Sequence, residues 1–288
     1  MVFCAAAAVL FACSQLGVVP RLTIAPGLTM PYVVLGTGSG QKGNVTSAAE
    51  LWFTSTAGQG VDTAFDYDDE SDLARGIAAA GVARGSIFIQ TKVPCGTAAQ
   101  AQSDFDANLQ QLGVATVDLT LIHYGCDTTK DTWRVLEAML AAGRTRAIGV
   151  SNFAKAELAT LLAYATTVPA VNQNSLSVEE HDEETLAYCQ EHNIVNQAFS
   201  PLCGGANGSS CSRHGGTSVL TIREVVAIAA AHNVSAAQVG LKWIIQRGFP
   251  LTTAVWRSDY MREDIDLWSW GNLTTAEMAT LSALQPKR

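Results

Sequence analysis

Residues 117–123 read VDLTLIH, and residues 147–151 read AIGVS. Both stretches are mostly apolar, whereas a strand with one face in water would alternate strictly between apolar and polar residues. Largely apolar strands are typical of a parallel sheet that is covered on both faces. Outward from these two stretches, the chain alternates short β-branched runs with Ala-, Leu- and Glu-rich segments. This alternation predicts a series of βαβ units.

The expected strands cover residues 32–36, 61–65, 87–93, 117–123, 146–151, 170–173, 195–199 and 250–255. The expected helices lie at 46–57, 69–83, 98–112, 130–142, 154–165, 181–192, 219–247, 258–267 and 274–284. Eight strands with helices between them, in a chain of 288 residues, predict an α/β protein with a (β/α)8 TIM barrel. An open doubly wound sheet is the alternative, because it is built from the same units.

The composition excludes two classes of protein. Hydrophobic residues make up 48% of the chain and charged residues only 15%, which argues against disorder. The formal net charge is −8, whereas a nucleic-acid binder should present a basic surface. A soluble globular protein without a nucleic-acid partner is the expectation.

We expect one barrel domain over residues 21–288, because no Pro- or Gly-rich linker divides it. Residues 1–20 are a candidate leader, since 2–12 are apolar but too short to span a bilayer. Residues 1–14 lack the Lys or Arg that opens a secretory signal, so a cytoplasmic location is favoured and export is the alternative. Four N-x-S/T sequons lean toward export, at Asn44, Asn207, Asn233 and Asn272.

The seven cysteines are Cys4, Cys13, Cys95, Cys126, Cys189, Cys203 and Cys211. An odd number without a C-x-x-C pair predicts neither a disulfide framework nor a zinc site. We expect them to be small buried hydrophobes. Four of them follow strand ends, at Cys95, Cys126, Cys203 and Cys211, and four unrelated thiols are favoured there over a redox switch or a metal site.

Gly38, Gly40 and Gly43 form the pattern G-x-G-x-x-G, with Asp62 downstream, as in dinucleotide-binding Rossmann folds. The pattern arises easily in a Gly-rich turn, and Asp62 begins a cluster of its own. No tyrosine has a lysine four residues later, so the Y-x-x-x-K pair of short-chain dehydrogenases is missing. We therefore do not expect a Rossmann enzyme.

Polar residues follow the ends of successive predicted strands. In a parallel barrel these ends meet at one mouth, where the active site lies. The residues are Asp62, Tyr67, Lys92, His123, Ser151, Asn152, Gln173 and Ser200. Taken singly they have ordinary explanations: Asp62 could cap a turn or pair with Lys92, Tyr67 could be a rim aromatic, and His123 could be a satisfied core histidine. Their joint placement favours a site instead.

The first four of these residues suit the reduction of a carbonyl group. A tyrosine titrates near 10, and a lysine beside it should lower that value so that the phenol donates a proton. A buried Lys92 needs Asp62 as its counter-charge. A neutral His123 could orient the carbonyl oxygen and help to protonate it.

The sequence resembles the aldo-keto reductase family over about residues 22–284. The stretches that carry the resemblance are LGTG (35–38), DTAFDYDDE (62–70), TKVP (91–94), DLTLIH (118–123), GRTRAIGVSNF (143–153), VNQ (171–173), AFSPL (198–202), HNVSAAQVGLKW (232–243), and EDIDL with LTTAEM (263–278). The resemblance implies a (β/α)8 barrel with a nicotinamide dinucleotide, usually NADPH, extended across its top. It implies Tyr67 as general acid, Lys92 and Asp62 as its tuning pair, and His123 as carbonyl orienter.

The resemblance also implies a set of cofactor-binding residues. Gly36 and Thr37 match the first loop beside the nicotinamide ring. Ser151, Asn152 and Gln173 match the positions that hold its carboxamide, and residue 199 matches the aromatic that stacks on it. Phe199 stands there in place of the usual Tyr, which keeps the stacking ring. Ser200 and Leu202 line the pyrophosphate path, and Glu263 and Asp264 match the adenine contacts.

Several positions depart from the family. Gly38 replaces a frequent Trp and the loop after His123 is short, so we expect a wide substrate pocket. Family members bind the 2′-phosphate of the adenosine with basic residues at two positions, where this chain has Ala254 and Tyr260. Arg257 is the candidate replacement. The expected cofactor is NADPH, with NADH as the alternative.

We expect an NAD(P)H-dependent reductase that converts an aldehyde or ketone to an alcohol, and that acts as a monomer on a small molecule. The alternative is a nicotinamide-binding regulatory subunit on the same barrel. The complete set of four polar residues favours catalysis. The substrate itself is not readable from the chain, because it depends on loop conformation.

Overall fold

The computed structural model describes residues 19–38, 42–203 and 218–284. The candidate leader, Gly40, Asn207 and Cys211 lie outside the described residues, apart from the last two positions of the leader. No helix within the described ranges is long and apolar enough to cross a membrane.

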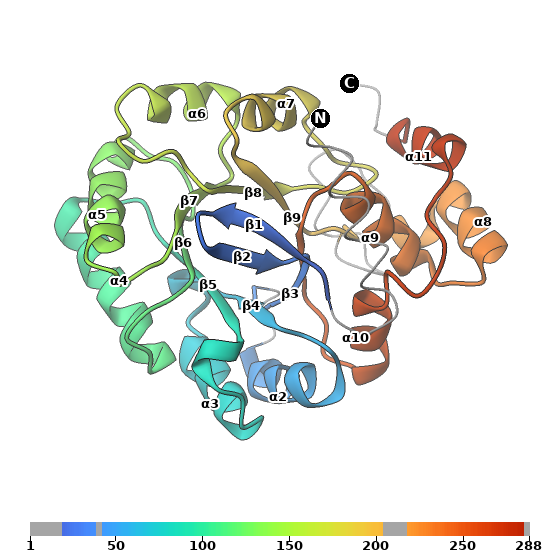
Figure 1. Cartoon of the computed structure of the whole chain (residues 1–288), viewed down its shortest axis with the longest axis horizontal. Coiled ribbons are helices and arrows are strands. Elements are labelled where there is room, and N and C mark those ends of the chain that lie inside the picture. Colours follow the sequence, from blue (N-terminus) through green and yellow to red (C-terminus); the bar gives the residue numbers. More distant parts are fainter. Residues whose placement is uncertain (1–18, 39–41, 204–217, 285–288) are drawn as a thin grey trace.

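Eight parallel strands close into a barrel in the described residues, with helices around it (Figure 1). The strands are β3 (Val33–Gly36), β4 (Gly60–Asp62), β5 (Phe88–Val93), β6 (Leu119–Ile122), β7 (Ile148–Ser151), β8 (Val171–Ser175), β9 (Val195–Phe199) and β10 (Leu251–Thr253). Neighbours in the chain pair from β3 to β9, and β10 pairs with both β9 and β3. The ring therefore has no open edge, which confirms the (β/α)8 barrel and excludes the doubly wound sheet.

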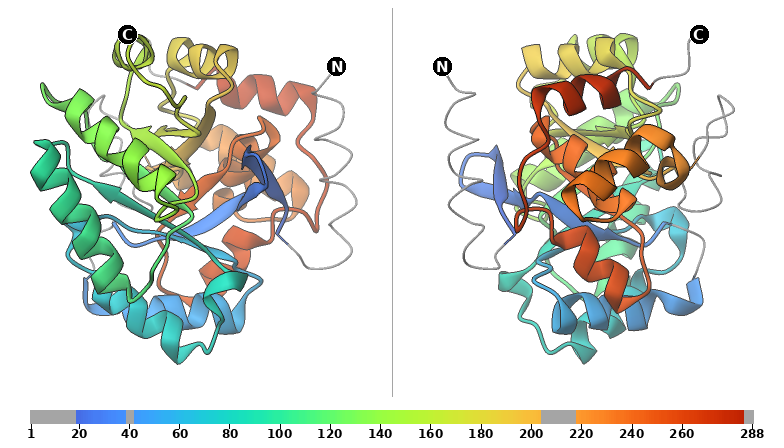
Figure 2. Two further views of the ribbon diagram at one scale, coloured as in Figure 1. Left: turned by 60° about the vertical axis from the view of Figure 1, so that its left-hand side comes forward. Right: turned by 90° about the vertical axis from the view of Figure 1, so that its right-hand side faces the viewer.

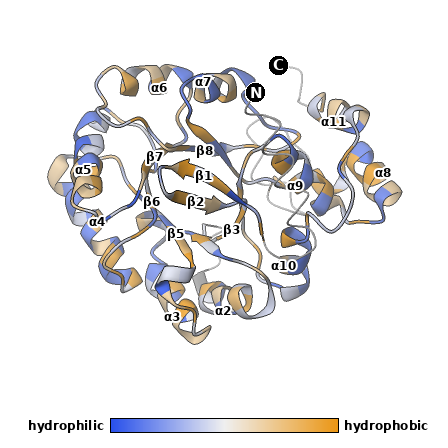
Figure 3. Ribbon diagram, in the orientation of Figure 1, coloured by the Kyte–Doolittle hydropathy of each residue, from blue (hydrophilic) through white to orange (hydrophobic). Residues whose placement is uncertain are grey.

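The barrel strands are buried on both faces, as the apolar stretches predict. Every residue of β3, β5, β6 and β7 is buried. Figure 3 shows that the surrounding helices carry both hydrophobic and hydrophilic residues. This distribution is that of helices packed by one face against a sheet.

The helices of the described residues are α2 (Val45–Ser55), α3 (Glu70–Ala79), α4 (Ala98–Leu112), α5 (Thr129–Ala141), α6 (Lys155–Leu162), α7 (Glu183–Glu191), α8 (Arg223–His232), α9 (Ala236–Gln246), α10 (Ser258–Ile265) and α11 (Thr275–Ser282). The single helix expected over 219–247 is thus two helices, α8 and α9. Asn233 ends the first in the left-handed region, with φ 56°. Ser235 begins the second, because its side chain accepts a hydrogen bond from the Gln238 backbone in a capping box.

An antiparallel hairpin precedes the barrel and was not expected from the sequence. It consists of β1 (Arg21–Ala25) and β2 (Leu28–Pro31), joined by a turn in which Gly27 has φ 70°. Leu28 and Met30 pack with residues of the barrel interior, including Phe88, Leu119 and Leu121. Figures 1 and 2 show the hairpin lying across one end of the ring. Since it leads into the start of β3, it closes the amino-terminal end of the barrel and leaves the opposite end for the site.

Candidate active site

Lys92 and Asp62 form an ion pair inside the barrel. Lys92 is on β5 and Asp62 is the last residue of β4, and their side chains are 1% and 4% exposed. The Lys92 Nζ donates to Asp62 Oδ1 at 2.6 Å and to the Thr63 carbonyl oxygen at 3.0 Å. Burial alone would lower the pKa of Lys92, but Asp62 and Tyr67 raise it above its ordinary value. The lysine therefore stays charged at neutral pH, as the sequence predicts.

Tyr67 ends a short 3₁₀ helix, Phe65–Tyr67, that follows β4. The Lys92 Nζ lies 3.5 Å from the Tyr67 hydroxyl and 5.1 Å from the centre of its ring. The phenol and the ammonium are therefore in direct contact. A Cβ on Gly38 would overlap the Tyr67 ring and hydroxyl, so Gly38 provides space at this end of the phenol.

The pKa of Tyr67 differs from the sequence expectation. Burial raises it above its ordinary value, and the Lys92 ammonium lowers it only in part, while Asp62 adds to the rise. The expectation of an unusually acidic phenol is wrong for this arrangement, because desolvation outweighs the neighbouring positive charge. Tyr67 is therefore fully protonated at neutral pH, with its hydrogen available for donation.

His123 follows β6 and completes the group of four. It is 5% exposed, and its ring stands edge-on to Tyr67 with centroids 5.5 Å apart. Burial, together with the positive charge of Lys92, lowers the pKa of His123 to about 3. The imidazole is consequently neutral at neutral pH. The structure thus brings Asp62, Tyr67, Lys92 and His123 together, as expected.

Sequence reasoning missed the side chain that contacts His123. Asp66 Oδ2 lies 3.0 Å from His123 Nδ1. Asp66 immediately precedes Tyr67 in the chain, but the direction of a side chain in a 3₁₀ helix is not evident from sequence. The sequence feature that could have pointed to Asp66 is its place directly before Tyr67, the candidate acid.

A layer of amide side chains surrounds the Asp62 carboxylate inside the barrel. Gln90 Nε2 donates to Asp62 Oδ1 at 3.0 Å, and Gln173 Nε2 donates to Asp62 Oδ2 at 2.8 Å. Gln173 Nε2 also donates to Gln197 Oε1 at 3.0 Å. Gln90 and Gln197 were not expected in the site, although Gln90 and Lys92 are two positions apart on one strand and so share a face. These bonds hold the Asp62 carboxylate in place beside Lys92.

Ser151 and Asn152 lie at the end of β7, next to His123. Asn152 Nδ2 donates to the His123 carbonyl oxygen at 3.0 Å and to Ser151 Oγ at 3.1 Å. Ser151 Oγ donates to the Gln173 carbonyl oxygen at 2.9 Å. Asn152 has φ 62°, a left-handed conformation that asparagine tolerates better than most residues. The carboxamide-binding candidates are therefore adjacent to one another.

The first loop is fixed by a second buried carboxylate. Asp69 Oδ1 accepts from the hydroxyls of Thr37 at 3.1 Å and Thr63 at 2.9 Å. Gly36 approaches the Thr252 side chain so closely that a Cβ would overlap its hydroxyl. Gly36 and Thr37 thus line the same end of the barrel as Tyr67. Asp69 was not among the expected residues.

Phe199 is the last residue of β9, Ser200 follows it, and Leu202 lies just beyond; all three are half-buried. Ser200 has φ 50°. The loop that continues from them, 204–217, is outside the described residues. Their proximity to a cofactor therefore stays a prediction.

The residues expected to bind the adenosine part of the cofactor differ in their exposure to solvent. Arg257 is exposed, paired with Asp259 at 2.5 Å and stacked on Tyr260 at 4.5 Å. Asp264 is buried instead and accepts from the Thr253 hydroxyl at 2.6 Å, while Glu263 is half-buried. Burial raises the pKa of Asp264 to about 7. The carboxyl of Asp264 therefore contacts β10, which sequence matching alone did not indicate.

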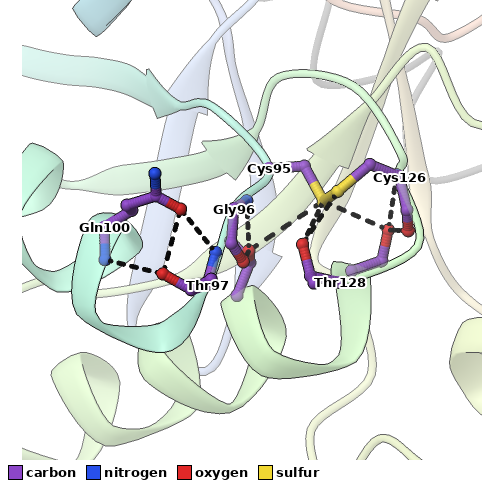
Figure 4. The surroundings of a disulfide bond; sticks show 8 residues. Cys95, Gly96, Thr97, Gln100, Cys126 and Thr128 are labelled. Atoms are coloured by element: carbon purple, nitrogen blue, oxygen red, sulfur yellow. Dashed lines mark hydrogen bonds between the residues drawn. A yellow bond between two sulfur atoms is a disulfide. The ribbon is translucent and has the colours of Figure 1, made fainter.

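The cysteines contradict the expectation of unrelated thiols. Cys95 follows β5, Cys126 follows β6, and the two form a disulfide with Cα atoms 5.9 Å apart. Figure 4 shows the bond joining the two loops, with Thr128 beside it. Cys203 is disulfide-bonded as well. The expectation failed because the chain separation of 31 residues hides the proximity that neighbouring strands create.

The expectation of a small buried hydrophobe is confirmed for Cys189. It is the free cysteine of the described part of the chain, it is buried, and burial raises the pKa of its thiol to about 11. Within the same residues no group of three or more His, Cys, Asp or Glu side chains could hold a metal ion.

The sequence and the fold of the chain are similar to those of known proteins. The model of the aldo/keto reductase family matches residues 52–286. The chain is 34% identical over 271 residues to morphine 6-dehydrogenase of Pseudomonas putida, covering 92% of this chain and 91% of the relative. It is 32% identical over 261 residues to glyoxal reductase of Bacillus subtilis, covering 90% of each. An aldo-keto reductase of Bombyx mori in complex with NADP superposes with a TM-score of 0.84, at 25% identity and 93% coverage of both chains.

The disulfide should stabilise the chain and hold the loop next to His123. Replacing both cysteines, in Cys95→Ser/Cys126→Ser, should lower the free energy of unfolding by about 3–4 kcal/mol, because it removes a closed loop of 31 residues from the denatured chain. Urea unfolding of the wild type and the double variant measures this difference. Equal midpoints would show that the bond does not constrain the denatured state. Cys189→Ala is the control for loss of a thiol without loss of a bond.

Proposed function

The chain belongs to the aldo/keto reductase family, and from this premise we propose that it reduces aldehydes or ketones to alcohols with a nicotinamide dinucleotide. The observation that carries the proposal is the contact between the Tyr67 hydroxyl and the Lys92 ammonium, 3.5 Å apart at the carboxyl end of the barrel. A regulatory subunit would not need a buried ion pair beside a protonated phenol. The relatives named above are a dehydrogenase and a reductase, which supports catalysis as well.

The amide residues beside His123 fit a nicotinamide carboxamide. Both hydrogens of Asn152 Nδ2 are used, on the His123 carbonyl and on Ser151, and both hydrogens of Gln173 Nε2 are used on Asp62 and Gln197. The oxygens of these two side chains remain as acceptors, and a carboxamide NH₂ group offers two donors. Asn152 and Gln173 would therefore hold the carboxamide, and Phe199 would stack on the ring. The cofactor supplies the hydride for the carbonyl carbon.

The residues of the chain supply the proton for the carbonyl oxygen. As negative charge develops on that oxygen, Tyr67 donates its hydroxyl hydrogen, because an alkoxide is a much stronger base than a phenolate. The Lys92 ammonium stabilises the phenolate that remains. Asp62 keeps Lys92 charged, and the amide layer holds Asp62 in place. Electrostatic stabilisation at this position costs no reorganisation, since the ion pair is already formed.

The cofactor preference depends on Arg257. Ala254 and Tyr260 stand where the family has basic residues for the 2′-phosphate, so Arg257 is the remaining candidate on this loop. Its side chain is 66% exposed and could exchange Asp259 for a phosphate. We therefore favour NADPH, with NADH accepted as well.

The disulfide and the sequons support export rather than the cytoplasmic location that the sequence favours. Disulfides persist in oxidising compartments and are rare in the cytosol. The three sequon asparagines that the structure describes are all exposed, at Asn44, Asn233 and Asn272. Exposure is what a glycosyl acceptor requires. A monomer remains the expectation for the assembly.

Tyr67→Phe should strongly slow carbonyl reduction and preserve cofactor binding. Loss of a general acid lowers kcat by about 10²–10⁴-fold, while the ring and its packing remain. The decrease of NADPH absorbance with a reactive aldehyde measures turnover, and quenching of tryptophan fluorescence measures binding. Full activity in this variant would remove Tyr67 as the acid. No turnover by the wild type with any aldehyde or ketone would refute the proposed function itself.

Arg257→Ala should weaken the use of NADPH selectively. One charge-assisted contact to the 2′-phosphate, made at the expense of the Asp259 pair, should change kcat/KM for NADPH about tenfold and leave that for NADH unchanged. Steady-state kinetics with both cofactors provide the ratio. Arg262→Ala, in α10, which begins directly after Arg257, is the matched control for loss of one positive charge. An unchanged ratio in Arg257→Ala would exclude Arg257 as the phosphate ligand.

Export predicts a glycosylated chain when the full sequence is expressed in a eukaryotic secretory host. The protein should appear in the medium with a mass above that of the polypeptide, and endoglycosidase should remove the excess. Asn272→Gln should remove one glycan, whereas Thr274→Ala would also remove the cap that Thr274 provides for α11. A chain that stays in the cytosol with unmodified asparagines would contradict export.

A further inference from the structure

A groove of about 470 Å³ lies at the amino-terminal end of the barrel, away from the candidate active site. Its lining comes from residues 24–26 of the hairpin, Leu140 of α5, residues 146–148 at the start of β7, residues 167–170 before β8, and residues 192–193 after α7. Figure 1 shows the hairpin with β7 and β8 beside it. The volume is within the range of about 300–1,000 Å³ that is usual for small-molecule sites.

Much of the lining is aliphatic. Ile24, Leu140 and Val168 supply branched hydrocarbon side chains. Val168 is 53% exposed, so about half of its surface is in contact with water. A hydrocarbon chain in the groove would displace water from these side chains, which is favourable. The groove therefore favours a ligand with an apolar part.

The charged part of the lining is cationic. Of the described residues that line the groove, Arg146 alone is an arginine or lysine, and none is Asp or Glu. Arg146 shares its counter-charge with a second arginine. Asp118 Oδ1 accepts from Arg146 at 2.9 Å, and Asp118 Oδ2 accepts from Arg84 at 2.7 Å. Because one carboxylate faces two guanidinium groups, the charge at this end of the barrel favours a further anion.

Arg146 also has hydrogen-bond donors for such an anion. Its side chain is 51% exposed, and a guanidinium group carries five N–H donors. Within the described residues, Asp118 accepts from NH1 at 2.9 Å and the Gly27 carbonyl oxygen accepts from NH2 at 3.3 Å. The bond to Gly27 holds the guanidinium next to the turn of the hairpin. The other donors can bind a carboxylate, whose two oxygens match a pair of N–H groups.

We propose that this groove binds a small aliphatic carboxylate, whose charged group pairs with Arg146 and whose hydrocarbon chain lies against Ile24 and Val168. A ligand of this kind uses both parts of the lining. An aliphatic amine would be repelled by Arg146, and an inorganic anion would leave the aliphatic side chains in water. The inference goes beyond the proposed function and does not depend on it.

The groove is separate from the active site. The strand β7 begins at the groove with Ile148 and ends with Ser151, which lies next to Asn152 and His123. A strand of four residues spans on the order of 10 Å. A ligand in the groove therefore leaves the carboxyl end of the barrel open to substrate and cofactor.

Titration with octanoate tests the proposal. In protein with ¹³C-labelled methyl groups, octanoate should shift the signals of Ile24, Leu140 and Val168, which are assigned through substitutions at these positions. Hexanoate should bind about 15-fold more weakly, because each of the two missing methylenes contributes about fourfold. Octylamine and 1-octanol should bind about tenfold more weakly than octanoate or less, because neither forms the charge-assisted pair. Wild-type signals that do not respond to octanoate would overturn the proposal.

Substitution of Arg146 separates the charge from the aliphatic surface. Arg146→Gln should weaken octanoate binding about tenfold and leave the binding of 1-octanol unchanged. Asp118 keeps Arg84 as its partner in this variant, so the fold should be retained. Arg144→Gln is the matched control, since Arg144 pairs with Asp106 and does not line the groove. Equal octanoate affinity in the wild type and in Arg146→Gln would contradict the role of the guanidinium.

Val168 offers a second test at an exposed position, where a polar residue should not disturb folding. Val168→Asp should weaken octanoate binding more than Val168→Asn does, because the two side chains have similar shapes and only the first repels a carboxylate. Equal effects of the two substitutions would show that the groove does not select an anion. Thermal unfolding of each variant identifies a general loss of structure.

Two other results would replace the proposed ligand with a different occupant or site. Octanoate that NADPH displaces and that binds normally to Arg146→Gln is a ligand of the barrel mouth. Signals of Ile24 and Val168 that change with protein concentration, and not with octanoate, show a second copy of the chain in the groove. Either result would overturn the proposal.

Discussion

The ion pair between Lys92 and Asp62 is the constraint on which the rest of the site depends. An ammonium that is 1% exposed is costly unless an anion lies next to it and the remaining hydrogen-bonding groups are satisfied. The barrel meets this requirement with Asp62, the Thr63 carbonyl and two glutamines. Because β4, β5 and β8 each contribute one of these groups, the complete set of contacts forms only when the ring of strands is closed. The fold and the acid–base chemistry are therefore linked.

The ion pair also explains why the Tyr67 phenol keeps its hydrogen and why its phenolate is stabilised once it forms. Its hydroxyl is buried enough for desolvation to raise the pKa, yet close enough to Lys92 for the phenolate to be stabilised once it forms. A phenol with a strongly lowered pKa would lose its hydrogen to water before substrate bound. In the observed arrangement the hydrogen remains on Tyr67 until a stronger base appears beside it.

The sequence predicted what depends on periodicity and chain order. Apolar strands and the polar residue at the end of each one indicated the barrel and the positions of Asp62, Lys92 and His123, because strand ends in a parallel barrel must converge. It did not predict contacts that depend on the direction of a side chain in a turn, such as Asp66 on His123. The disulfide between Cys95 and Cys126 was missed for a related reason, since loops 31 residues apart become neighbours only through strand pairing. The inward carboxyl of Asp264 likewise follows from packing against Thr253 rather than from any local pattern.

The two loops that the disulfide joins also frame His123. Cys126 lies three residues after it, and the bond connects this loop to the end of β5, the strand of Lys92. Asp66 holds the imidazole from the side of β4, and Asn152 holds its backbone from β7. The histidine thus receives a contact from each neighbouring part of the ring, although it contributes no charge of its own. The neutral imidazole needs these fixed contacts because its role depends on which of its atoms faces the substrate. The charge of Lys92, in contrast, acts over a longer distance and in every direction. The geometry around His123 therefore concerns orientation, and the geometry around Lys92 concerns charge.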